Sequence, residues 1–274
     1  MSNQNQQLTI GFIGAGNMAS AIARGLVKKG HNPEKVIMSN RSAGKLEQLA
    51  DELSVQTTQN NQEVCDKADV ILLSVKPQMM ADAISELDFS TVQVAVSVAA
   101  GLTTDNLKQM TQNKVAMVRS MPNTPSIELC GATGLYADDA VKKQHAESVN
   151  YVFGAIGEFE WVPDENLMDT VTALAGSSPA YFFRFMETLI EAGTKQGMDE
   201  QTARNLVVQS ALGAATLIKN HPDIAISERR TQVTSPNGTT AAALDSLEQS
   251  GIADMADKAV KAAVNRGKEL SEGK

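Results

Sequence analysis

Near its N-terminus the chain reads Leu8-Thr9-Ile10-Gly11-Phe12-Ile13, and Gly14-Ala15-Gly16-Asn17-Met18-Ala19 follows at once. The first stretch is apolar and β-branched, which is typical of a short buried strand, and residues 19–28 have helical periodicity. G-x-G-x-x-A between a strand and a helix is a dinucleotide-binding fingerprint: Gly14 permits a tight turn, Gly16 lets a pyrophosphate approach the backbone, and Ala19 allows close packing. The segment predicts a Rossmann-like domain; the alternative is a glycine turn in an α/β domain that binds no nucleotide.

Strand and helix patterns alternate through about the first 160 residues, as a doubly wound sheet requires. The stretch 70–75 is apolar nearly throughout, which fits a central parallel strand covered on both faces. The expected strands are 8–13, 35–39, 54–57, 70–75, 92–98, 114–118, 134–136 and 158–162, and the expected helices between them include 19–28, 45–53, 79–86, 103–110 and 139–156.

Beyond Pro163 the strand patterns stop and only helices are expected, at 166–175, 178–197, 200–219, 240–249 and 252–270. Several are rich in small residues and apolar on more than one face. A domain of about 110 residues cannot hide that much helix surface by itself, so we expect it to dimerise; the alternative is a compact monomeric bundle. The sequence therefore predicts an α/β dinucleotide-binding domain over 1–162 and an all-α dimerisation and substrate-binding domain over 163–274.

The end of the second strand indicates which nicotinamide cofactor is preferred. An NAD site places Asp or Glu about 20 residues after the glycines. Here the chain reads Ser39-Asn40-Arg41-Ser42, with a cation and no carboxylate. This favours NADPH, with weaker use of NADH; the alternative is that Arg41 is a solvated surface charge.

Composition excludes several classes of function. The chain has 24 basic and 32 acidic residues, for a net charge of −8, and no basic cluster, so nucleic acid is not an expected partner. The opening residues 1–7 lack the pattern of a signal peptide, and no apolar run is long enough to cross a bilayer, so a cytoplasmic protein is expected. Two distant cysteines and three isolated histidines, expected at the surface, predict no metal site.

A second distinctive stretch, Val233-Thr234-Ser235-Pro236-Asn237-Gly238-Thr239-Thr240, lies between helix-like segments. Pro presets φ, and Asn and Gly tolerate positive φ, so a tight turn is expected at 236–238. Thr239 and Thr240 stand where a helix should begin and would cap it, and a helix N-terminus offers free N–H groups to an anion. The loop is thus either a carboxylate site among hydroxyls or an ordinary capped turn.

Four further segments lie where a doubly wound enzyme keeps its chemistry, just beyond strands or at the opening of the helical domain. Together with the 233–240 loop they are expected to form a cleft between domains, the usual place for a small substrate. They are Ser74-Val75-Lys76-Pro77, Ser97-Val98-Ala99-Ala100-Gly101, Arg119-Ser120-Met121-Pro122-Asn123-Thr124-Pro125 and Ala175-Gly176-Ser177-Ser178-Pro179-Ala180-Tyr181.

With these motifs the chain resembles the pyrroline-5-carboxylate reductase family over essentially its whole length. G-F-I-G-A-G-N-M-A, S-V-K-P, R-x-M-P-N-T-P, G-S-x-P-A-Y and V-T-S-P-x-G-T-T occur in the family's order and at about its spacings. The resemblance implies NADPH-dependent reduction of pyrroline-5-carboxylate to L-proline, the last step of proline biosynthesis. It also implies a homodimer through the C-terminal helices, and dimers that often assemble into decamers.

The resemblance also implies roles for individual residues. Substrate is expected on Glu165, Ser235, Gly238, Thr239 and Thr240, and Thr240 is the catalytic candidate that hydrogen-bonds the ring nitrogen, as proton donor or through a water. Two positions depart from the family pattern: Asn237 and Ser178 each stand where it has glycine. Carried over by motif, the cofactor contacts are Ile13, Gly14, Ala15, Gly16, Asn17, Met18, Ser39, Asn40, Arg41, Asn60, Ser74, Val75, Lys76, Pro77, Ser97, Ala99, Ala100 and Gly101.

Two other functions are compatible with this domain layout. An NADP-dependent β-hydroxyacid dehydrogenase has a similar domain layout but uses a lysine on the first helix of its C-terminal domain. Here residues 177–193 contain no lysine, and Lys195 is the first. A non-catalytic NADP-sensing protein is the other rival; intact motifs on both sides of the expected cleft argue against it.

Overall fold

The computed structural model describes residues 7–271, so most of the polar opening segment lies outside it. The chain forms two compact units, one of residues 7–177 and 262–271 and the other of residues 178–261. The boundary expected after residue 162 lies inside the first unit. The last helix begins in the second unit and ends in the first.

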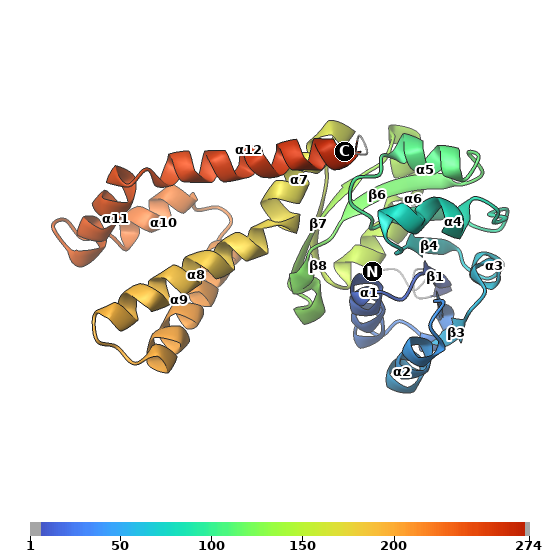
Figure 1. The fold of residues 1–274 in the computed structure, drawn as a ribbon, viewed down its shortest axis with the longest axis horizontal. Coiled ribbons are helices and arrows are strands. Elements are labelled where there is room, and N and C mark those ends of the chain that lie inside the picture. The colour runs from blue at the N-terminus through green and yellow to red at the C-terminus, as the bar shows by residue number, and fades with distance from the viewer. Residues whose placement is uncertain (1–6, 272–274) are drawn as a thin grey trace. The chain divides into compact units, whose positions relative to one another are not determined.

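The first unit contains an eight-stranded sheet, ordered β3-β2-β1-β4-β5-β6-β7-β8 (Figure 1). All neighbours are parallel except β6 and β7, which are antiparallel. This order, in which the chain starts centrally and winds outward both ways, is the doubly wound arrangement that the sequence predicts. The strands are β1 Ile10–Ile13, β2 Val36–Ser39, β3 Gln56–Thr58, β4 Val70–Leu73, β5 Val94–Ser97, β6 Ala116–Met121, β7 Gly131–Tyr136 and β8 Gly157–Trp161.

Helices cover both faces of this sheet. One hydrophobic cluster joins strand residues such as Phe12 and Leu72 to α1, α2 and α6, and a second joins residues such as Ile71 and Leu73 to α3, α4 and α5. All four residues of β4 are fully buried, as the apolar run predicted. The helices are α1 Asn17–Lys28, α2 Ala43–Leu53, α3 Asn61–Cys65, α4 Met80–Ile84, α5 Thr104–Met110 and α6 Asp139–Gly154, and short 3-10 turns are η2 Pro33–Lys35, η3 Pro77–Met79 and η4 Thr124–Glu128.

The helix expected over 166–175 is broken into three short pieces. They are the 3-10 turn η5 Glu165–Leu167, the helix α7 Met168–Val171 and the π-helical turn η6 Thr172–Gly176. In the π turn the Ser177 N–H donates to the Thr172 carbonyl at 2.8 Å. The carbonyl of Ala175 instead accepts from the buried Asn123 side chain at 3.1 Å. Residue 179, the regular helical partner of this carbonyl, is a proline without an N–H, so the Asn123 side chain satisfies the carbonyl in its place.

The second unit is entirely helical over its described residues, as expected. It contains α8 Ser178–Lys195, α9 Glu200–Asn220, α10 Ile226–Gln232 and α11 Thr239–Gln249, and α12 Ile252–Ser271 begins in it. The short, charged α10 was not among the expected helices. Large apolar side chains on α8 and α9, such as Phe182 at 62% and Leu212 at 59%, are exposed. No helix in the described part of the chain has the length and apolarity that crossing a membrane demands.

Two of the three histidines are buried, although surface positions were expected. His31 is 1% and His145 is 8% exposed. The Nδ1 atom of His31 lies 2.9 Å from the hydroxyl of Tyr151, on α6, and the two rings are tilted against each other. The sequence neighbours of these histidines are polar, so only the contact between distant segments could reveal their burial.

Candidate functional site

The turn between β1 and α1 requires glycine at its first position. Gly14 has φ +97°, and a β-carbon added there would lie 2.8 Å from the carbonyl oxygen of Ser74. The Gly14 N–H donates to the Ser39 carbonyl at 3.0 Å, which ties the turn to the end of β2. The prediction of a tight glycine turn, made from the fingerprint, is confirmed.

Gly16 needs another explanation, because neither strain nor packing demands glycine there. Its φ is −69°, and the nearest atom to an added β-carbon is the Ser74 carbonyl oxygen at 3.8 Å. A side chain would thus fill open space in front of the turn. No side chain caps the first turn of α1, and no acidic residue lies in it. Open space before an uncapped helix N-terminus suits a phosphate group.

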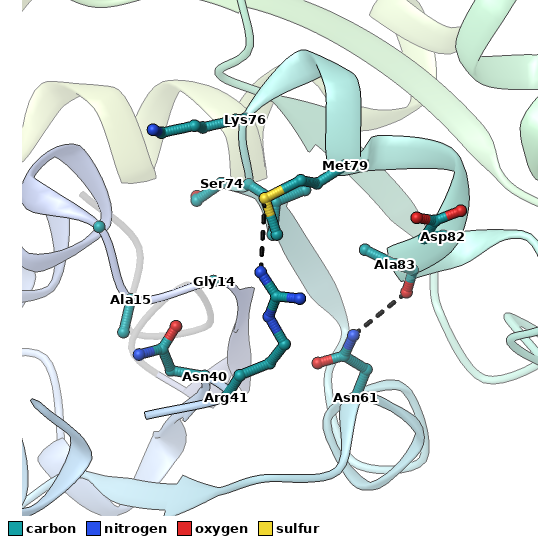
Figure 2. A pocket seen from close by; sticks show the side chains of 12 residues that line it. Gly14, Ala15, Asn40, Arg41, Asn61, Ser74, Lys76, Met79, Asp82 and Ala83 are labelled. Carbon is teal, nitrogen blue, oxygen red and sulfur yellow. Dashed lines mark hydrogen bonds between the residues drawn. The ribbon is translucent and has the colours of Figure 1, made fainter. Parts of the chain in front are cut away.

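A pocket of about 510 Å³ opens at this point. Figure 2 shows it from close by, between the β1–α1 turn, the ends of β2 and β4, and α4. It unites three predicted motifs, and four lining residues (Asn61, Met79, Asp82 and Ala83) were missed. The full lining is Gly14, Ala15, Gly16, Asn40, Arg41, Asn61, Ser74, Val75, Lys76, Met79, Asp82 and Ala83.

Two cations and one carboxylate line this pocket: Arg41, Lys76 and Asp82. Arg41 is exposed, and its Nη2 atom is 3.5 Å from the Met79 sulfur, a weak contact drawn in Figure 2. Among residues 7–271 neither Arg41 nor Lys76 forms an ion pair. Both cations therefore remain free to meet an anionic ligand.

Two neighbouring predicted residues, Ser39 and Asn60, form hydrogen bonds within the protein instead. The Ser39 side chain is fully buried, and its hydroxyl lies 3.1 Å from the Phe12 carbonyl and 2.7 Å from Asn61 Oδ1. Asn60 caps α3 by accepting from the Gln62 N–H at 2.9 Å. Asn61 lines the pocket one residue later, a difference that no sequence signal separates. The predicted cofactor residues outside this lining are Ile13, Asn17, Met18, Ser39, Asn60, Pro77, Ser97, Ala99, Ala100 and Gly101.

Glu165, predicted on the substrate side, is held by contacts within the first unit. Its carboxylate accepts from the backbone N–H of Thr104 at 2.8 Å and from the Thr104 hydroxyl at 2.7 Å. Arg119 Nη1 donates to the same carboxylate at 3.3 Å, and Arg119 Nη2 is 3.7 Å from Asp169. Burial first, and then the negative charge of Glu165, raises the pKa of the Tyr136 phenol.

The loop 233–240 lies in the second unit and forms the predicted tight turn. Asn237 has φ +57°, so the expected positive φ is confirmed. The Gly238 N–H donates to the Ser235 carbonyl at 3.0 Å. The expectation that Thr239 and Thr240 cap the next helix is wrong: α11 starts at Thr239, its N-cap is Gly238, and no side chain caps it. A Cβ on residue 238 would approach the Ser235 carbonyl oxygen to 3.1 Å, which explains why a small residue takes the cap position.

Three hydroxyls at this loop have no partner within the described residues. The side chains of Ser235, Thr239 and Thr240 are exposed and form no hydrogen bond in that range. They stand beside an uncapped helix N-terminus whose N–H groups are free to bind an anion. The described residues hold no group of three or more His, Cys, Asp or Glu side chains that could hold a metal ion.

Comparison with known proteins gives two family matches along the chain. Residues 165–270 match the family described as pyrroline-5-carboxylate reductase dimerisation. Residues 9–101 match the family described as NADP oxidoreductase, coenzyme F420-dependent. The first match includes all the helices of the second unit, and the second includes strands β1 to β5 of the sheet.

Relatives cover nearly the whole chain. A pyrroline-5-carboxylate reductase of Haemophilus influenzae is 42% identical over 97% of this chain and 98% of its own length. The solved pyrroline-5-carboxylate reductase of Coxiella burnetii has a TM-score of 0.89 at 38% identity and covers 96% of this chain and 98% of its own. The Plasmodium falciparum enzyme, solved with NADP bound, has a TM-score of 0.83 at 27% identity, over 97% of this chain and 99% of its own. The chain therefore belongs to the pyrroline-5-carboxylate reductase family.

Proposed function

We propose that this protein reduces pyrroline-5-carboxylate to L-proline with NADPH, the last step of proline biosynthesis. The observation that carries this function is the relationship over 97% of the chain to a reductase of that name. The pocket at the β1–α1 turn supports it independently, because its open space before Gly16 and its two unpaired cations suit a phosphorylated dinucleotide.

Different residues of this pocket would bind the pyrophosphate and the 2′-phosphate of the cofactor. The backbone of Gly14 to Gly16 and the N-terminus of α1 would hold the pyrophosphate, and Arg41 with Asn40 would hold the 2′-phosphate. NADH lacks that phosphate and would bind more weakly. When bound, the cofactor supplies a hydride. The predicted contacts outside the pocket lining, from Ile13 to Gly101, stay predictions.

The substrate side is assigned to the loop of the second unit. The hydroxyls of Ser235 and Thr239 and the backbone at Gly238 would bind the carboxylate, helped by the N-terminus of α11. Thr240 would hydrogen-bond the ring nitrogen. A threonine hydroxyl is a poor acid, so it orients a water or passes on a proton that comes finally from solvent. The direct substrate contact predicted for Glu165 stays a prediction and is tested below.

The chemistry asked of these residues is modest. The carbon of a cyclic imine accepts a hydride, and its nitrogen accepts a proton. A protonated imine is already electrophilic, so the protein's task is to place the two partners correctly, which supplies much of the rate. Hydroxyls and backbone N–H groups that do not titrate near neutral pH are suited to this task.

The family membership also bears on assembly: this is a protein of an oligomeric family, acting on a small molecule. The finer proposal is a homodimer through the helices of 163–274, which would cover the exposed apolar side chains of α8 and α9. Assembly of dimers into a decamer, the division of labour between 1–162 and 163–274, and a cytoplasmic location are further parts of this proposal.

The decisive experiment is to add pyrroline-5-carboxylate to purified protein and NADPH and follow the loss of NADPH absorbance. Steady oxidation with proline as product is expected. Turnover of a 3-hydroxyacid with NADP⁺ instead would favour a β-hydroxyacid dehydrogenase, and cofactor binding without turnover of either compound would favour a sensor.

A further inference from the structure

The segment 98–103 joins the end of β5 to the start of α5 and has no regular structure. It contains three of the predicted cofactor contacts, and Gly101 within it has φ +77°. Few hydrogen bonds lie inside it; Ala99 N–H donates to the Ser97 hydroxyl at 3.2 Å, just before it. Its position is therefore set by how its two ends are held and by α12, whose Leu270 would lie 3.6 Å from a β-carbon added to Gly101.

The first end is held by the neighbouring strand. Ser97, the last residue of β5, pairs with Arg119 in the parallel register of β5 and β6. The hydroxyl of the next residue, Ser120, donates to the Ser97 carbonyl at 2.8 Å, with both side chains fully buried.

Two sets of contacts hold the second end: Thr103 and Asn106 form a capping box at the start of α5, and Glu165, 61 residues beyond Thr104, binds Thr104. Thr104, the first residue of α5, gives both its backbone N–H and its hydroxyl to the two oxygens of this carboxylate. Arg119 holds the carboxylate in turn, through Nη1 at 3.3 Å. Strand β6, through Ser120, and strand β4, whose Leu73 carbonyl accepts from the Val98 N–H at 3.1 Å, thus hold the start of the segment. The Arg119 side chain, through Glu165, helps to hold the end.

Burial makes this arrangement stiff. The side chains of Arg119, Glu165 and Asp169 are 6%, 20% and 15% exposed. Removing the Glu165 charge takes away the shorter of the two ion pairs of the buried Arg119 and leaves it with Asp169, 3.7 Å from Nη2. Glu165 already accepts three hydrogen bonds from this chain, and a substrate would have to compete with them.

We propose that Arg119 and Glu165 are positioning residues that hold segment 98–103 against the cofactor, acting through Thr104. The inference rests on the proposed function, because it takes residues 97–101 as cofactor contacts. If the proposal holds, replacing Glu165 weakens NADPH binding. If Glu165 instead contacts the substrate directly, replacing it weakens binding of the imine.

The test compares three variants in the full-length protein. Glu165→Gln keeps the shape but loses the ion pair with Arg119 and at least one acceptor. Thr104→Val removes only a hydroxyl from a nearly isosteric buried side chain, so it should fold. The matched control is Glu52→Gln, which breaks an exposed pair with Arg24 in the same unit. The readouts are NADPH binding by titration calorimetry, the KM for pyrroline-5-carboxylate at saturating NADPH, and hydrogen exchange of peptides over 98–104.

We expect the NADPH dissociation constant to rise at least about fivefold in both Glu165→Gln and Thr104→Val, with faster exchange over 98–104 and the KM for the imine within about twofold. The double variant should be no worse than the stronger single one, because the two residues act in one chain of contacts. Glu52→Gln should match wild type.

Two results would overturn the inference. One is unchanged NADPH binding in the folded variants. The other is a raised KM for the imine in Glu165→Gln with Thr104→Val silent, which would make Glu165 a substrate ligand. Wild-type protein that fails to bind NADPH would overturn the proposed function itself, and this inference with it.

Discussion

Arg41→Ala tests whether Arg41 binds the 2′-phosphate, which NADPH has and NADH lacks, or a part of the cofactor that both share. Unit charges about 4 Å apart attract by about 1 kcal/mol in water, and a phosphate monoester carries close to two negative charges at pH 7. Because Arg41 is exposed, the water value applies, and its interaction with the phosphate is worth roughly 2 kcal/mol. Loss of the guanidinium should raise the KM for NADPH about 30-fold. The KM for NADH should change less than about twofold.

The fold should not suffer from this change, because the contact of Arg41 with the Met79 sulfur, at 3.5 Å, is weak and Arg41 is in no ion pair among the described residues. Steady-state kinetics with both cofactors, repeated at low and high salt, would measure the effect. Screening should shrink the NADPH penalty as salt rises. Arg41→Lys should recover part of the affinity, and Arg24→Ala, outside the pocket, serves as control. Equal losses for NADPH and NADH would refute the assignment of Arg41 to the phosphate.

The remaining predictions concern the loop, the assembly and pH. Thr240→Ala should lower turnover at least about tenfold, or ~1.4 kcal/mol, while Thr240→Ser retains most activity; because Thr240 caps nothing, a variant with lowered thermal stability but intact turnover would contradict its role. Asn237→Val should lower stability by about 1–2 kcal/mol in chemical denaturation, since φ is +57°, whereas Asn237→Gly should be mild; equal midpoints would contradict this. Light scattering at micromolar concentration should give at least twice the 29.2 kDa chain mass, and a stable, active monomer would exclude the dimer. Burial lowers the pKa of His31 and of His145 below 6.5, so as the pH falls these histidines are protonated in the unfolded chain before they are protonated in the folded protein. Their contribution to the stability of the fold should therefore be complete above about pH 6.5 and decrease as the pH falls below that value. Denaturation midpoints that do not change between about pH 7.5 and 5 would contradict this.

Much of the nucleotide-binding unit could be predicted because its signals are local. An apolar run such as β4 and a glycine turn such as Gly14 to Gly16 carry their meaning in adjacent residues. The turn at Asn237 could also be predicted, because asparagine and glycine tolerate positive φ.

What sequence missed depends on partners distant in the chain. The helix expected over 166–175 opens into a π turn whose Ala175 carbonyl accepts a bond from Asn123. His31 looked exposed because Tyr151, against which it packs, lies 120 residues away. Asn61 rather than Asn60 lines the pocket, and only the start of α3 decides which of the two amides turns inward.

The first unit is formed from two separate stretches of the chain, so it cannot finish folding until α12 has been synthesised. Its sheet is encoded before residue 162, yet the unit also includes residues 262–271, the end of α12. There a β-carbon added to Gly267 would lie 3.0 Å from an Asp169 oxygen, and one added to Gly101 would lie 3.6 Å from Leu270. At translation rates of about 5–20 residues per second, these contacts become available roughly ten seconds after the sheet has been synthesised. Until α12 has been synthesised, the surface around Asp169 and Gly101 therefore stays uncovered. Chains truncated before α12 should be bound by chaperones or cleaved by proteases more readily than the full chain.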